Sequence, residues 1–158
     1  MSGTMIIDGR KIPFTGQKNI LSVIRDSGID LPTFCYHSEL SIYGACRMCS
    51  VETSRGEIIA TCSEKPRDGL EIYTNSPRIR KYRKMILELL LSSHDKDCTA
   101  CERTGKCQLQ TLAKRYGLSN NRFTQSVQEH EIDSSSPSII RNPNKCIKCG
   151  DCVMVCEE

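Results

Sequence analysis

The sequence predicts an α+β fold that depends on metal centres as well as on an apolar core. Three observations indicate this. Short apolar runs alternate with polar residues before Pro77, helical apolar spacing begins there, and eleven cysteines fall into three groups. Aromatic residues make up only 5% of the 158 residues, and Trp is absent. A chain with so few large core residues needs cross-links in addition to apolar burial.

Residues 1–76 are expected to form a mixed sheet with one helix. The stretch "TMIIDGRKIPF" places two apolar runs around Asp8-Gly9, which is a strong hairpin signal. Asn19 can cap a helix that ends at Gly28, and "RMCSVET", "EIIATC" and "LEIYT" follow as strands. A hairpin, a helix and further strands in this order indicate a β-grasp ferredoxin-like domain.

Residues 77–135 are expected to form a small helical domain. Pro77 can begin the first helix, and a second helix after Cys107 would end at Gly117. The cysteine loop would then lie between two helices. The predicted apolar faces comprise Ile79, Tyr82, Ile86, Leu89 and Leu90 in the first helix and Leu109, Leu112, Ala113 and Tyr116 in the second.

Two polar segments complete this part of the chain. Residues 118–138 are polar, and "DSSSPS" within them indicates a linker or a surface loop. A basic run in the first predicted helix is interpreted as a solvated helix face rather than a docking patch. This run comprises Arg78, Arg80, Lys81, Arg83 and Lys84.

The cysteines are expected to be reduced and to bind metal. Their number is odd, and the N-terminus lacks the basic segment and apolar run of a secretory signal, so disulfides are disfavoured. A reducing, cytoplasmic location follows as an expectation. The longest apolar run, "MILELLL", is interrupted by Glu88 and is too short to cross a bilayer. The formal charge of +3 falls toward zero once thiolate-bound clusters are counted, which argues against a nucleic-acid partner.

The first cysteine group has the spacing C-x10-C-x2-C-x12-C and predicts a 2Fe–2S cluster. Each iron of such a cluster takes two protein sulfurs in a tetrahedral arrangement. The small residues Gly44 and Ala45 leave room for backbone amides to approach the bridging sulfides. Zinc is the alternative, but structural zinc sites favour two C-x2-C pairs and this group has one. The expected ligands are Cys35, Cys46, Cys49 and Cys62.

The second group has only three cysteines, at C-x2-C-x5-C, and needs a fourth donor. A 4Fe–4S cluster takes one protein ligand at each iron, and iron accepts a neutral imidazole. His94 is the only histidine nearby, and Gly105 would let the loop turn tightly. The expected ligands of this 4Fe–4S cluster are His94, Cys98, Cys101 and Cys107.

The third group is C-x2-C-x2-C-x3-C, within residues 136–158. In bacterial ferredoxins the first three cysteines of such a run hold one 4Fe–4S cluster and the fourth serves another cluster. Glu157 stands where the usual pattern has proline. We therefore expect an incomplete 4Fe–4S site at Cys146, Cys149 and Cys152, with Cys156 serving a separate or partner cluster. On this interpretation, residues 136–158 are a truncated bacterial-type ferredoxin segment. The chain is then expected to be a fragment, or a subunit whose last site is completed by another chain.

The motifs "YGACRMCSVE", "HDKDCTACERTGKCQLQ" and "SPSIIRNPNKCIKCGDCVMVCEE", in this order, resemble a known iron–sulfur region. It is the N-terminal region shared by di-iron hydrogenases, the α subunits of NAD-linked formate dehydrogenases and the large iron–sulfur subunit of NADH–quinone oxidoreductase. The resemblance covers essentially the whole chain. It implies an electron-transfer module, not catalytic alone, between a flavin- and NAD(P)H-binding subunit and a redox catalytic subunit. Ferredoxin is a further candidate partner.

The terminal substrate stays open at this point. A di-iron hydrogenase is the first expectation for the parent complex, because the segment around Ser136-Pro137-Ser138 leans toward that family. A formate dehydrogenase and an NADH–quinone oxidoreductase are the alternatives. A function of another class, a metal-stabilised structural or redox-sensing module without electron transfer, also fits the cysteine pattern.

Overall fold

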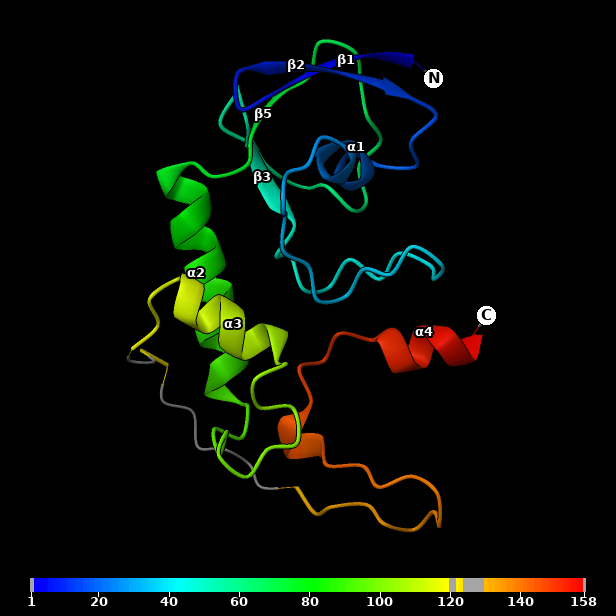
Figure 1. Cartoon of the computed structure of the whole chain (residues 1–158), viewed down its shortest axis with the longest axis vertical. Coiled ribbons are helices and arrows are strands. Elements are labelled where there is room, and N and C mark those ends of the chain that lie inside the picture. The colour runs from blue at the N-terminus through cyan, green and yellow to red at the C-terminus, as the bar shows by residue number, and fades with distance from the viewer. Residues whose placement is uncertain (1, 120–121, 124–129, 158) are drawn as a thin grey trace. The chain divides into compact units, whose positions relative to one another are not determined.

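The computed structural model describes residues 2–119, 122–123 and 130–157 (Figure 1). The chain divides into two units, and each is described by itself. The first comprises residues 1–83 together with 149–158, and the second comprises residues 84–148.

The first unit begins with the predicted hairpin. Strands β1 (Ser2–Ile7) and β2 (Arg10–Thr15) pair antiparallel, with Ile7 opposite Arg10. The turn residues Asp8 and Gly9 both have positive φ, 49° and 80°. Two such residues give a turn whose twist matches that of the flanking strands. The sequence signal at Asp8-Gly9 is therefore confirmed.

Three short strands complete the sheet: β3 (Ser50–Thr53), β4 (Ile58–Ala60) and β5 (Glu71–Tyr73). The strand order is β2-β1-β5-β3-β4. Strand β5 runs parallel to β1 and antiparallel to β3, so the two ends of the chain segment meet at the centre of the sheet. This is a β-grasp topology, and the predicted fold class is confirmed.

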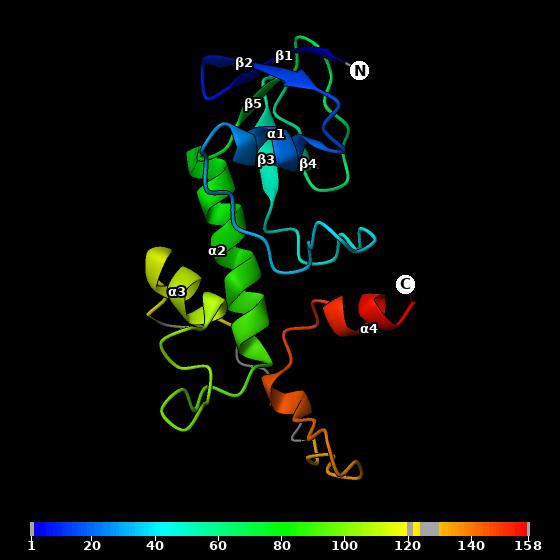
Figure 2. The same ribbon diagram turned by 45° about the vertical axis from the view of Figure 1, so that its right-hand side comes forward.

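Helix α1 (Ile20–Asp26) covers one face of this sheet (Figure 2). The side chain of Asn19 accepts a hydrogen bond from the backbone N–H of Ser22 at 2.9 Å, as the capping prediction requires. The apolar side of the helix is fully buried, and each such side chain contributes about 1.5–3 kcal/mol. The core joins Ile20, Leu21, Val23 and Ile24 of the helix to Met5, Ile7, Val51 and Ile72 of the strands.

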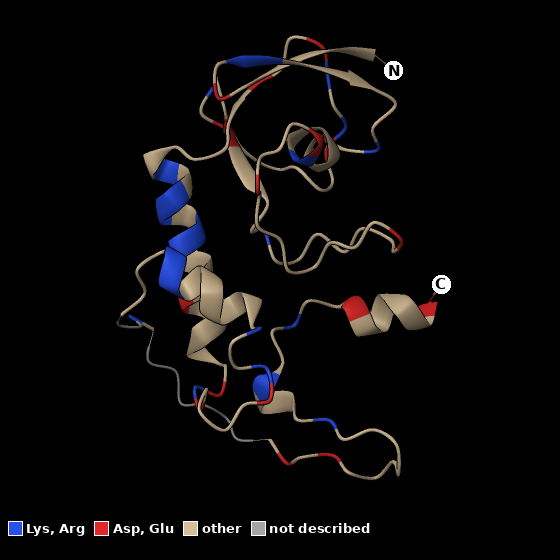
Figure 3. Ribbon diagram, viewed as in Figure 1, with Lys and Arg blue, Asp and Glu red and all other residues tan. Residues whose placement is uncertain are grey.

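Helix α2 (Pro77–Ser92) begins at the predicted proline, but its buried face differs from the predicted one. The predicted core residue Leu89 is 50% exposed. Arg83, assigned to a solvated face, is only 2% exposed, so that part of the interpretation is wrong. Lys and Arg residues do recur along the first part of this helix (Figure 3). Ile79, Arg83 and Leu87, four residues apart, are buried along one side of the helix. Arg83 can be buried there because three backbone carbonyl oxygens accept hydrogen bonds from its guanidinium.

The second unit contains helix α3 (Gln108–Arg115) and a short 3-10 helix, η1 (Pro143–Lys145). The predicted face of α3 is confirmed at Leu109 and Leu112, which are buried. The helix ends before Gly117, whose φ of 62° lies in the left-handed region.

A buried carboxylate also belongs to the second unit. Glu88 is 1% exposed and accepts hydrogen bonds from the Nε and Nη2 atoms of Arg122 at 2.9 and 2.5 Å. The hydrogen bonds from this guanidinium hold the pKa of the Glu88 carboxyl below its ordinary value. No local sequence pattern indicates this ion pair, because its two partners lie 34 positions apart.

The polar stretch predicted as a linker is described only in part, because residues 120–121 and 124–129 lie outside the described residues. Further on, Asp133 and Arg141 exchange backbone hydrogen bonds of 2.9 and 2.8 Å, which close the loop that contains "DSSSPS". The predicted domain boundaries at residues 76 and 135 stay predictions. No helix among the described residues has the length and apolar character needed to cross a bilayer.

Candidate metal centres

The four cysteines of the first group lie in the first unit, where the structure brings them together in two pairs. Cys49 leads into β3 and Cys62 follows β4. The Cys35 thiol hydrogen-bonds with that of Cys46, and the backbone N–H of Cys46 donates to Cys35 Sγ at 3.3 Å. The Cys49 and Cys62 thiols form the second hydrogen-bonded pair. Three of the four thiols are buried, and Cys46 is half-buried.

This pairing separates the ionisation of the two thiols in each pair. The hydrogen bond from Cys35 lowers the pKa of Cys46 from 9.0 to about 6, and backbone N–H groups of Phe34 and Met48 act in the same direction. The hydrogen bond from Cys62 likewise lowers the pKa of Cys49 to about 6. The hydrogen bonds and burial raise the pKa of the partner thiols, Cys35 and Cys62. In each pair, one thiol is therefore the more readily ionised member.

We expect two thiols of the metal-free chain to ionise near pH 6, about three units below the ordinary value of 9.0. The ultraviolet absorbance of thiolate during a pH titration measures this. Because these folded-state pKa values lie below those of the unfolded chain, the stability that they contribute is complete above pH 9 and is lost as the pH falls through about 6.

The matched control is Cys35→Ala, which removes the hydrogen bond to Cys46. In this variant one of the two early ionisations should move back toward pH 9.0. Ionisation of all thiols only near pH 9.0 in the parent chain would contradict the paired arrangement.

Two pairs of sulfurs fit two irons better than one tetrahedral metal ion. A structural zinc site places four donors around one ion, whereas these thiols form two hydrogen-bonded pairs. Gly44, in the loop before Cys46, has a φ of 68°, and a Cβ there would meet no protein atom within 4 Å. A glycine is thus favoured here by the backbone conformation. The donor set suits a 2Fe–2S cluster.

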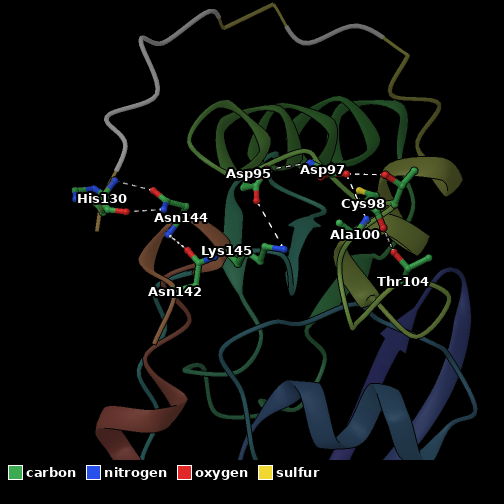
Figure 4. A network of polar contacts seen from close by, with 10 residues as sticks. Asp95, Asp97, Cys98, Ala100, Thr104, His130, Asn142, Asn144 and Lys145 are labelled. Carbon is green, nitrogen blue, oxygen red and sulfur yellow. Dashed lines mark hydrogen bonds and ion pairs between the residues drawn. The ribbon is translucent and has the colours of Figure 1, made fainter. Parts of the chain in front are cut away.

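The three cysteines of the second group lie in one loop. Figure 4 shows the side-chain hydrogen bonds around Cys98. Asp97 Oδ1 accepts from Thr99 Oγ1 at 2.6 Å and from the backbone N–H of Ala100 at 3.3 Å. The Thr104 hydroxyl donates to the carbonyl oxygen of Cys98. Cys107 ends the loop as the N-cap of α3, where its sulfur accepts from the backbone N–H of Gln110 at 3.5 Å. The loop thus holds Cys98, Cys101 and Cys107 within one turn-rich segment.

His94, at the start of this loop, has the properties of a metal ligand. Its Nδ1 atom is buried and has no hydrogen-bond partner among the described residues. Burial lowers the pKa of the imidazole and Lys145 acts in the same direction, while Asp95 partly opposes them. A half-buried imidazole that stays neutral at pH 7 keeps a lone pair available for a metal. A role as the fourth ligand of a metal centre would explain why this polar atom makes no hydrogen bond to the protein.

Residues just before the third group are bound to the His94 loop within the second unit (Figure 4). The backbone N–H of Asp95 donates to the carbonyl oxygen of Asn144 at 2.8 Å, and Lys145 Nζ lies 3.7 Å from Asp95 Oδ2. The Asn144 amide in turn exchanges hydrogen bonds of 2.9 and 2.8 Å with the backbone of His130. The sequence did not reveal the contacts of Asp95 with Asn144 and Lys145, because they join residues about 50 positions apart.

The third group is divided between the two units. Cys146, in the second unit, accepts a hydrogen bond from the backbone N–H of Lys148 at 3.4 Å. The other three cysteines belong to the first unit, where Cys152 and Cys156 lie one turn apart on helix α4 (Asp151–Glu157). The incomplete 4Fe–4S site and the separate role of Cys156 stay predictions.

Two further groups contact the backbone beside Cys49, and no local sequence signal marks them. The Thr61 hydroxyl, fully buried, donates to the carbonyl oxygen of Cys49 at 2.8 Å. Arg83 donates to the carbonyl oxygens of both neighbours, Met48 and Ser50. Only the spacing of four residues between Arg83 and the apolar positions on either side of it could have suggested burial.

Comparison with known proteins gives two family matches. The 2Fe-2S iron-sulfur cluster binding domain matches residues 4–77. The NADH-ubiquinone oxidoreductase-G iron-sulfur binding region matches residues 83–122. The two matches follow each other in the chain and contain the first and second cysteine groups.

Several curated proteins are similar over nearly the whole chain. The NADP-reducing hydrogenase subunit HndD of Solidesulfovibrio fructosivorans is 38% identical over 97% of this chain. The mitochondrial NADH-ubiquinone oxidoreductase 78 kDa subunit of Candida albicans is 35% identical over 93%, and the NADH-ubiquinone oxidoreductase 75 kDa subunit of Reclinomonas americana is 36% identical over 98%. The chain spans only 27%, 21% and 22% of these three proteins, respectively.

A solved structure extends the similarity to three dimensions. A chain of the NAD+-reducing NiFe hydrogenase, crystallised in its H2-reduced state, superimposes with a TM-score of 0.91 at 33% identity. The superposition covers 99% of this chain and 68% of the hydrogenase chain.

Proposed function

Because this chain belongs to the family of iron–sulfur electron-transfer modules found in the large iron–sulfur subunit of NADH–quinone oxidoreductase and in NAD(P)-reducing hydrogenases, we propose that it relays single electrons within an NAD(P)-linked hydrogenase complex. The cofactors of this family are 2Fe–2S and 4Fe–4S clusters. A bound cluster takes up or releases one electron with little structural change. The protein then contributes ligands, spacing, low dielectric and hydrogen bonds to sulfur.

We assign the ligands of the first cluster from the thiol pairs. Cys35 and Cys46 would bind one iron, and Cys49 and Cys62 would bind the other. The observation that supports this is the paired hydrogen bonding, which favours the thiolate form of one member of each pair. Thiolate is the form of cysteine that binds metal.

We assign His94, Cys98, Cys101 and Cys107 to a 4Fe–4S cluster. The observation that carries this assignment is the buried, unpaired Nδ1 atom of His94 beside a loop that supplies only three thiols. Burial keeps the imidazole neutral, as coordination to iron requires. Mixed imidazole and thiolate ligation also limits the negative charge at the centre.

The proposed partners follow from the chemistry named in the similar proteins. Their names refer to NADH, NAD+ or NADP in each case, so a flavin-containing subunit that exchanges hydride with a nicotinamide is the partner proposed at one end. HndD and the solved hydrogenase support a hydrogen-activating unit at the other end. A quinone-reducing complex is the second candidate, because the family that matches residues 83–122 is named for NADH-ubiquinone oxidoreductase.

Anaerobic purification of the tagged chain with its native partners tests this proposal. We expect NAD(P)H and hydrogen gas, added separately, each to bleach the visible absorption of the complex. Neither reductant should bleach the isolated chain. The difference would arise because, on this proposal, the groups that convert hydride or hydrogen into single electrons belong to the partners. Bleaching by NAD(P)H but not by hydrogen would favour the quinone-reducing alternative, and no bleaching by either reductant would contradict both.

A further inference from the structure

The buried guanidinium of Arg83 is bound to the backbone on both sides of a proposed cluster ligand. Arg83 Nε donates to the carbonyl oxygen of Met48 at 3.0 Å, and Nη2 donates to that of Ser50 at 2.6 Å. Between these two residues lies Cys49. The third nitrogen, Nη1, donates to the carbonyl oxygen of Thr74 at 2.9 Å. One side chain therefore ties the ligand segment to the connection between β5 and α2.

These contacts limit the movement of the peptide groups next to the thiols. Met48 is held from both ends, since its N–H donates to the Cys46 sulfur while its carbonyl accepts from Arg83. In a trans peptide the C=O and N–H groups point in opposite directions. Because the Met48 carbonyl faces Arg83, the N–H of Cys49 points away from the guanidinium. Arg83 thus fixes the direction of an amide that belongs to the proposed ligand itself.

The Thr74 end of this arrangement is also fixed. The backbone N–H of Thr74 donates to Asp8 Oδ1 at 2.7 Å, and its hydroxyl donates to Asp8 Oδ2 at 2.5 Å. Asp8 lies in the first hairpin turn. Arg83 therefore connects the segment at Cys49 to a residue that is itself hydrogen-bonded to the first hairpin turn.

The charge of Arg83 is the second element of the inference. Burying a charged group is costly even when its hydrogen bonds are made, and an apolar side chain at this helix position would avoid that cost. A guanidinium keeps its positive charge throughout the ordinary pH range. A positive charge bound to the carbonyl oxygens on both sides of Cys49 would stabilise the extra negative charge of a reduced centre held by this residue.

We propose that Arg83 is a positioning residue for the 2Fe–2S centre, which fixes the backbone around Cys49 and raises the reduction potential through its buried charge. This inference rests on the proposed ligation by Cys35, Cys46, Cys49 and Cys62. The two ideas fail separately. A parent chain without a 2Fe–2S signal refutes the ligation, whereas a parent signal that Arg83 variants leave unchanged refutes only the role of Arg83.

Two variants of the 158-residue chain with its clusters bound, Arg83→Gln and Arg83→Lys, separate the effect of the charge from that of the hydrogen-bond geometry. Both variants lose the three-way fork, but only lysine keeps the charge. We expect Arg83→Gln to lower the ratio of reduced to oxidised 2Fe–2S centre at least tenfold at a fixed potential, a shift of about 59 mV for one electron. Arg83→Lys should shift less. Arg80→Gln, at an exposed arginine of the same helix, is the matched control and should leave the potential unchanged.

Electron paramagnetic resonance during a redox titration gives the potential of whatever fraction is loaded, so a low yield does not prevent the measurement. Loss of only the 2Fe–2S signal from both variants, with the 4Fe–4S signal and the circular dichroism retained, would also support positioning. An unchanged potential in Arg83→Gln, or equal shifts in Arg83→Gln and Arg80→Gln, would overturn the proposal. Loss of both clusters together with the fold would overturn it too, since Arg83 would then be a general stabilising residue.

Discussion

Replacing Cys49 by alanine is expected to abolish the 2Fe–2S signal of the reduced chain and to remove about two irons per chain. Cys49 shares a hydrogen-bonded pair with Cys62 and carries the thiol with a pKa of about 6. Without it, one iron would have a single protein thiol, and a buried centre tolerates such a gap poorly. Electron paramagnetic resonance of the anaerobically reduced chain, together with iron analysis, measures the loss.

Cys107→Ala is the reciprocal control, because Cys107 belongs to the second group and caps helix α3. It should remove the 4Fe–4S signal and leave the 2Fe–2S signal in place. An unchanged spectrum in Cys49→Ala would show that the first group does not hold the 2Fe–2S centre.

Replacing His94 by alanine is expected to destroy or strongly alter the 4Fe–4S centre. His94→Cys should instead retain it and lower its reduction potential by on the order of 100 mV, since a thiolate adds a negative charge that the imidazole lacks. The unpaired Nδ1 atom supplies the structural reason to expect coordination at this residue. A redox titration followed by electron paramagnetic resonance measures both effects.

His130 offers a control histidine in the same unit, because its hydrogen bonds to Asn144 use only main-chain atoms. His130→Ala should leave the spectrum and the potential of the 4Fe–4S centre unchanged. An intact, unshifted centre in His94→Ala would exclude ligation by His94. A potential that rises in His94→Cys would contradict the charge argument.

The sequence predicted those parts of the fold that local chemistry determines. The Asp8-Gly9 turn requires two residues with positive φ, and Asn19 makes the hydrogen bond of an N-cap. Pro77 begins α2 because its missing N–H is not needed in the first turn. The β-grasp topology followed from the order of these elements, although the strands are shorter than the apolar runs that predicted them.

The buried face of α2 could not be predicted, because it depends on distant backbone groups. Arg83 is buried only because the carbonyl oxygens of Met48, Ser50 and Thr74 meet at its guanidinium. Those residues lie 9 to 35 positions away in the chain. In a sequence, an arginine in a helix usually indicates a solvated position. The prediction therefore placed Arg83 on the exposed face and Leu89 in the core, whereas Arg83 is buried and Leu89 is exposed.

Cysteine spacing did not predict the internal geometry of the first cysteine group. The C-x2-C unit of the first group does not form a pair, since Cys46 pairs with Cys35 and Cys49 pairs with Cys62. This arrangement depends on the loop conformation and on the distance between β3 and β4. The contact between Asp95 and Asn144 was missed for the same reason, because it is made by tertiary structure alone.

The central claim is that this chain carries single electrons on two different iron–sulfur centres. A stepwise anaerobic reductive titration of the loaded chain, followed by electron paramagnetic resonance and iron analysis, tests it most directly. We predict one electron taken up at a 2Fe–2S centre that Cys49→Ala removes, and one at a 4Fe–4S centre that His94→Ala destroys or alters. A colourless chain that binds zinc and takes up no electrons would contradict the account.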